Sequence, residues 1–163
     1  MNKKKISKLL LVMALALLLI VLIGVGYGYL NQEKTQGGMI LDENAEQYDP
    51  EASLETDGNG IAIPGYGVIY FPENETDVQI TLYNPEQNTC LFQFELYIDD
   101  ESQPIASTDL VEPGKAVSEV TLSRALEAGT YTLSIKVLTY AVDTFAPLNN
   151  AMVRTQLSVL ADE

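Results

Sequence analysis

Downstream of Gly60, apolar side chains recur at every second residue in a series of short runs. This alternation is typical of β-strands with one buried face, whereas an amphipathic helix repeats every 3.6 residues. Turn-forming residues separate the runs, as at 84–86, 99–101 and 112–114. The pattern predicts strands at 68–71, 77–83, 92–98, 104–106, 120–122, 131–137 and 153–159.

Six or seven short strands in about 100 residues, without a convincing helix among them, predict an all-β fold. We expect two antiparallel sheets packed face to face as an immunoglobulin-like β-sandwich. Tyr131 stands at the start of a late strand, where that fold places a tyrosine whose hydroxyl bonds back to the backbone. Ordinary core packing of the ring is the alternative.

A run without any charge extends from 9 to 30 and follows Lys3, Lys4, Lys5 and Lys8. As a helix it would span roughly 33 Å, enough to cross a hydrocarbon core of about 30 Å. Because basic residues favour the cytoplasmic side, we expect residues 1–8 inside the cell and the chain beyond Leu30 outside. The run predicts a single-pass signal-anchor of the cell membrane, with cleavage as the alternative.

Residues 31–60 are acidic and lack a periodic apolar pattern. Like charges extend such a segment, and it has too little apolar surface to fold alone. We therefore expect a flexible tether between the membrane span and an extracellular β-sandwich domain at 61–163.

The chain beyond the span contains five basic residues and all 23 acidic ones, so its net charge is −18. Such a surface repels nucleic acid and anionic lipid headgroups. It favours cationic partners or serves to keep the domain soluble, and we expect no nucleic-acid partner.

The sequence contains no histidine and a single cysteine, Cys90. Histidine-based triads and zinc sites are therefore excluded, and no disulfide can form within one chain. We expect Cys90 to be buried as a small apolar residue, with intermolecular pairing as the alternative.

Nothing selects a catalytic or metal site among the carboxylates. The acidic turn at 99–101 offers three adjacent side chains, whereas calcium needs six to eight oxygen ligands around it, so we expect a solvated turn. No carboxylate pair stands out, and there is no tryptophan platform for a sugar. We predict no enzymatic activity, no cofactor and no metal.

Several turn and strand-start segments resemble those of small, membrane-anchored, Ig-like surface proteins of Gram-positive bacteria, a largely uncharacterised family. The segments are IPGY at 63–66, YNPE at 83–86, LVEPGK at 110–115, LEAGTY at 126–131 and PLNNA at 147–151. The resemblance covers roughly residues 61–160 and implies no activity and no functional residue.

One predicted sheet face carries aromatic and basic side chains beside an apolar loop at 140–151. Tyrosine and arginine are enriched among binding hot spots. The predicted partner-binding residues are Tyr97, Leu138, Tyr140, Phe145 and Arg154. Scattered exposure of these side chains, or a loop folded over the core, is the alternative.

These observations predict a membrane-anchored extracellular interaction or assembly module that presents an acidic β-sandwich to another surface or secreted protein. A carbohydrate-binding module at the cell surface is the alternative, which exposed and stacked tyrosine rings would favour. A hydrolase is the most distant possibility.

Overall fold

The computed structural model describes residues 38–50 and 60–161. The predicted leader, the predicted span at 9–30 and residues 31–37 and 51–59 of the predicted tether lie outside this part. Within the described residues, no helix is long and apolar enough to cross a membrane.

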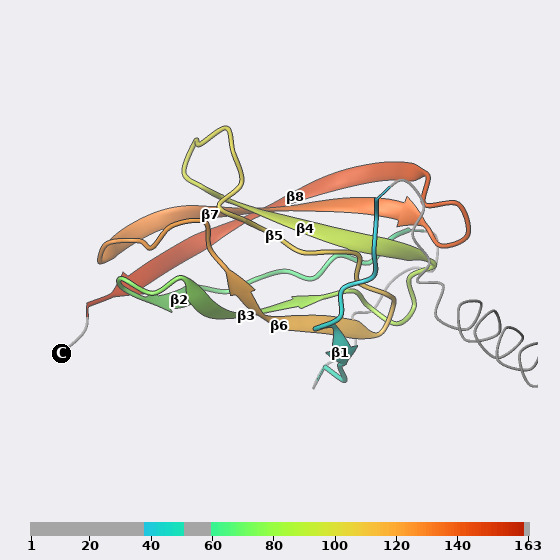
Figure 1. Ribbon diagram of the computed structural model, residues 1–163, viewed down its shortest axis with the longest axis horizontal. Coiled ribbons are helices and arrows are strands. Elements are labelled where there is room, and N and C mark those ends of the chain that lie inside the picture. The colour runs from blue at the N-terminus through green and yellow to red at the C-terminus, as the bar shows by residue number, and fades with distance from the viewer. Residues whose placement is uncertain (1–37, 51–59, 162–163) are drawn as a thin grey trace, which may run out of the picture. The chain divides into compact units, whose positions relative to one another are not determined.

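The described chain is all-β, as predicted, and forms eight strands without a helix (Figure 1). Each run with period-two alternation is found as a strand, and Asp77–Tyr83 agrees with its prediction at both ends. The strands are β1 (Glu46–Gln47), β2 (Ile69–Pro72), β3 (Asp77–Tyr83), β4 (Cys90–Ile98), β5 (Ala106–Ser107), β6 (Lys115–Thr121), β7 (Gly129–Ala141) and β8 (Pro147–Leu160).

The strands form two sheets. The smaller sheet has the order β1-β6-β3, and the larger one has the order β2-β8-β7-β4-β5. Every neighbouring pair is antiparallel except β2, which runs parallel to β8 and pairs only with its last residues, 157–160. The strands that carry Glu95, Leu133 and Leu157 share the larger sheet.

One apolar core lies between the sheets, because both contribute their inward-facing residues to a single cluster. Leu82 of β3 and Val117 of β6 meet Phe94 of β4 and Ile135 of β7, all nearly inaccessible to solvent. Each fully buried side chain of this size contributes about 1.5–3 kcal/mol. Cys90 belongs to this core, which confirms its predicted burial, and burial raises the pKa of its thiol.

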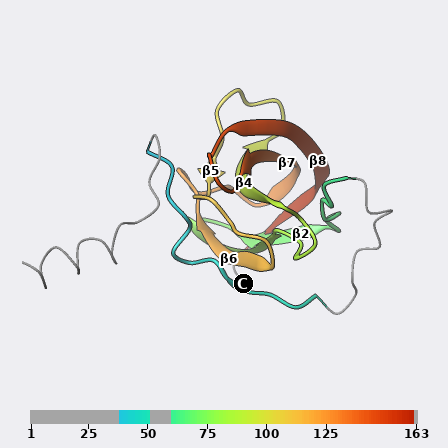
Figure 2. The same ribbon diagram turned by 90° about the vertical axis from the view of Figure 1, so that its right-hand side faces the viewer.

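Part of the predicted tether packs onto the domain. Leu41 bridges Leu110 in parallel, and β1 pairs with β6. The ring of Tyr48 lies 4.9 Å from that of Tyr83. In Figure 2 the segment 38–47 runs along one side of the two sheets, from β5 toward β6. Residues 38–50 are therefore not free coil, because their few apolar side chains find partners in the folded domain.

The predicted loop at 140–151 is also largely strand. β7 continues to Ala141 and β8 begins at Pro147, so these two strands form a long hairpin around a short turn. Phe145 closes this turn with a left-handed backbone, φ 54°. The β7–β8 pairing shifts register between Leu138 and Tyr140 and then continues to the turn, where Tyr140 lies opposite Pro147.

Candidate functional site

The predicted partner-binding residues come from the outer face of the five-stranded sheet and from its hairpin turn, and the structure divides them into two groups. The register places Tyr97, Ser134 and Arg154 in one row across β4, β7 and β8. Leu138 lies two residues along β7 from Lys136, toward the turn. Tyr140 and Phe145 lie at the turn end, so the five residues do not form one patch.

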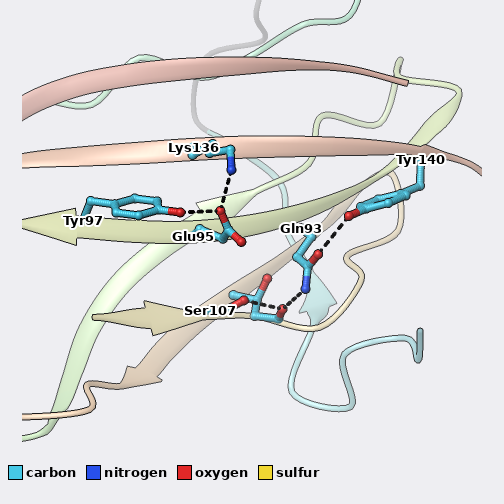
Figure 3. Close-up of polar contacts among 7 residues, drawn as sticks. Gln93, Glu95, Tyr97, Ser107, Lys136 and Tyr140 are labelled. Atoms are coloured by element: carbon cyan, nitrogen blue, oxygen red, sulfur yellow. Dashed lines mark hydrogen bonds and ion pairs between the residues drawn. The ribbon is translucent and has the colours of Figure 1, made fainter. Parts of the chain in front are cut away.

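Tyr97 is held in a polar network on this face (Figure 3). Its hydroxyl donates a hydrogen bond to Glu95 Oε2 at 2.7 Å, and Lys136 Nζ donates to the same oxygen at 2.9 Å. Partial burial raises the pKa of Glu95, but the hydrogen bonds from Lys136 and Tyr97, together with the positive charge of Lys136, outweigh it and hold this pKa below its usual value. The carboxylate accepts both donors, so Tyr97 is a fixed part of the sheet surface.

Tyr140 and Phe145 are buried, with exposed fractions of 8% and 9%. They form a second apolar cluster with Leu91 and Leu110, against which Leu138, Met39 and Leu41 pack. The Tyr140 hydroxyl donates to Gln93 Oε1 at 3.2 Å (Figure 3). The hairpin turn thus folds over the outer face of the sheet, and these two rings offer little surface to a partner.

Arg154 is exposed on β8. It lines a shallow hollow of about 390 Å³ together with Asp99, Thr132 and Gln156. The Asp99 carboxylate accepts a hydrogen bond from the Thr132 amide at 2.8 Å, so it stabilises the turn at 99–101. Of the predicted set, Arg154 has the side chain most available to a partner.

A larger groove, of about 750 Å³, lies elsewhere on the domain. Its walls are the segment 40–46, residues 107–109 at β5, and residues 117–121 of β6. Five carboxylates line it, and no lysine or arginine is among the lining residues: Asp42, Glu43, Glu46, Asp109 and Glu119. We call this feature the acidic groove.

Backbone pairing between segments far apart in sequence builds the acidic groove. The Asp42 amide donates to the Leu110 carbonyl at 2.8 Å, and the Leu110 amide donates to the Ile40 carbonyl at 3.0 Å. The Asp109 amide donates to Asp42 Oδ2, also at 3.0 Å. These bonds fix the segment 40–46 beside β5, and the β1–β6 ladder fixes its other end.

One carboxylate of the acidic groove, that of Asp109, is affected by its neighbours. Partial burial raises the pKa of Asp109, and the nearby charges of Asp42 and Glu43 raise it further. The pKa of Asp109 is therefore higher in the folded protein than in the unfolded chain, so the ionised carboxylate opposes folding at pH values above this pKa. The destabilisation fades as the pH falls through the pKa, because the carboxylate becomes protonated. A cation placed between these groups would relieve the repulsion.

Within the described residues, no three acidic or sulfur side chains converge closely enough to hold a metal ion. Carboxylates such as those of the acidic groove can accept hydrogen bonds from ammonium or guanidinium groups.

Sequence reasoning did not find the acidic groove. Asp42, Glu43 and Glu46 lie in the stretch predicted as a free tether, and Asp109 and Glu119 lie in separate segments beyond Gly60. The one available signal was the pair Met39 and Leu41, apolar residues within acidic sequence, which anchor this stretch to the second cluster.

No protein-family model and no curated protein matches this chain.

Proposed function

We propose that this protein is a membrane-anchored extracellular interaction module whose acidic groove binds a basic, extended segment of another surface or secreted protein. The observation that carries the proposal is the groove itself, with five lining carboxylates and no lining cation.

The polar lining fits the donors of lysine and arginine. The lining also includes the hydroxyl residues Ser107, Ser118 and Thr121, whereas the hydroxyl of Thr108 is bonded to the backbone of Phe94 and Asp109. Guanidinium and ammonium groups only donate hydrogen bonds, so a groove lined by acceptor oxygens can satisfy them. Carboxylates of one sign within a concave surface also attract such a segment before contact.

We propose further that the two sheets form an immunoglobulin-like sandwich. The parallel β2–β8 pair at the edge of a sheet that also contains β7 and β4 supports this type. The Tyr131 hydroxyl donates to the Glu127 carbonyl at 2.9 Å, the bond that a tyrosine corner makes. Leu133 is fully buried two residues later, where antibody domains carry their second cysteine.

The membrane location rests on the sequence alone. The uncharged run at 9–30 and the four lysines before it support an anchor with the domain outside the cell. The resemblance to surface proteins of Gram-positive bacteria supports the same compartment.

The alternative, a carbohydrate-binding module, has less support at this site. Sugar rings stack on exposed aromatic side chains, and none of the residues that line the acidic groove is aromatic. Tyr70 is the most exposed large apolar residue of the described chain, but it lies on β2, at the opposite edge of the five-stranded sheet from β5. We therefore favour a protein ligand.

Capture from cell envelopes tests the proposal. The full-length chain, displayed with a tag, is compared with the groove variant Glu43→Gln/Glu46→Gln/Asp109→Asn, whose three side chains are exposed. We expect the parent protein to capture a partner with a basic segment and the groove variant to recover less than about a tenth of it, since tenfold corresponds to about 1.4 kcal/mol.

A matched control separates this site from general charge. The variant Asp100→Asn/Glu127→Gln/Asp143→Asn also removes three exposed carboxylates, and none of the three lines the acidic groove. It should capture the partner as the parent does. Equal recovery by all three proteins would show that the groove is not the binding site.

A further inference from the structure

Within the described residues, the outer edge of β8 has no paired strand over most of its length. β2 pairs only with 157–160, and no other described strand adjoins β8 on that side. Thr155 Oγ1 donates to the Gly67 carbonyl, which marks where the chain before β2 reaches the strand. Residues 147–154 thus leave roughly 26 Å of strand edge without a described partner, at about 3.3 Å per residue.

Exposed apolar side chains accompany this edge. Leu148 and Met152 are 48% and 47% exposed and face outward from the core. Val142 in the adjoining turn is also exposed. An open edge with apolar neighbours is a template for pairing with another strand.

The charge of the β7–β8 hairpin differs from that of the rest of the chain. Residues 128–161 contain one acidic residue, Asp143, and two basic ones, Lys136 and Arg154, in a protein of net charge −14. Two copies that meet at β8 therefore bring together a part of the chain with few carboxylates. A meeting at the acidic groove would instead oppose like charges.

From these observations we infer that two copies of this chain associate by pairing their β8 strands in antiparallel orientation, which joins the two five-stranded sheets into one. A two-fold axis through the middle of the open stretch makes the contact self-complementary. In this arrangement Arg154 of one copy lies near Leu148 of the other copy, so the two arginines stay apart. This inference is independent of the acidic groove.

Disulfide trapping in the full-length chain tests the contact. Cysteine is placed at Asn150 or Met152, and the two variants are oxidised with copper phenanthroline separately and as a mixture. Paired strands bring Cα atoms within the 4.4–6.8 Å that a disulfide requires. We expect a linked dimer in at least one of these samples, while the parent protein stays unlinked because Cys90 is buried.

Leu160→Cys is the matched control, since Leu160 lies on the same strand and face and is 51% exposed, but β2 occupies its edge. Equal linkage at this position, or no linkage at 150 and 152, would overturn the inference. In a second readout, Leu148→Glu/Met152→Glu should convert the detergent-solubilised chain to a monomer in sedimentation, and Leu160→Glu should not. Unchanged sedimentation of the first variant would also overturn it.

Discussion

Replacing Asn84 by alanine is expected to destabilise the domain by about 3 kcal/mol. The Asn84 side chain is fully buried and donates to the carbonyls of Cys90 and Val111, each at 2.9 Å. Its carbonyl accepts a hydrogen bond from Asn88 Nδ2, also at 2.9 Å. Alanine leaves the Cys90 carbonyl and one Asn88 donor without these partners, and burial makes such losses costly.

The free energy of unfolding in urea, measured on the compact unit 36–163, checks this prediction. Asn44→Ala is the matched control, because Asn44 is exposed in a turn and should lose less than about 0.5 kcal/mol. A loss below 1 kcal/mol for Asn84→Ala would contradict the importance given to this network.

Replacing Tyr140 by alanine is expected to cost about 3 kcal/mol, whereas Tyr97→Ala should cost about 1 kcal/mol. Both tyrosines lie on the outer face of the same sheet, so the pair is matched in residue type and location. Tyr140 fills the second apolar cluster, whereas the Tyr97 ring is only half-buried. The segment 38–41 and Phe145 cover the Tyr140 ring, so truncation of this side chain leaves a cavity beneath them.

The same urea measurement distinguishes the two tyrosines. Tyr140→Phe removes only the 3.2 Å bond to Gln93 and should cost at most about 1 kcal/mol. Equal losses for the two alanine variants would show that the second cluster contributes no more than an exposed sheet face does.

The strands could be predicted because each depends on a local pattern. In β3, Val78, Ile80 and Leu82 alternate with polar residues, and the structure buries all three. The alternation also indicated which face of a strand is solvated. In β4, for example, Glu95 and Tyr97 point away from the core and alternate with buried residues. Local patterning of this kind sets secondary structure and the inward face together.

The acidic groove and the buried hairpin turn could not be predicted, because both depend on contacts between distant segments. Tyr140 alternates like an outward-facing residue, and it does face outward, but residues 38–41 cover it. The acidic composition around Asp42 predicts free coil, yet two backbone bonds to Leu110 hold this segment in place. Neither contact leaves a periodic signal in the sequence.

Titration with octalysine tests the central claim, that the acidic groove is the site for a basic segment, most directly. The parent protein, the groove variant and the control variant are titrated by calorimetry at about 0.15 M salt, where exposed charges farther apart than roughly 8 Å are largely screened. We predict that the groove variant binds octalysine at least tenfold more weakly and that the control variant binds within about threefold of the parent. Equal weakening by both variants would contradict the claim, because the attraction would then come from the overall charge of the domain.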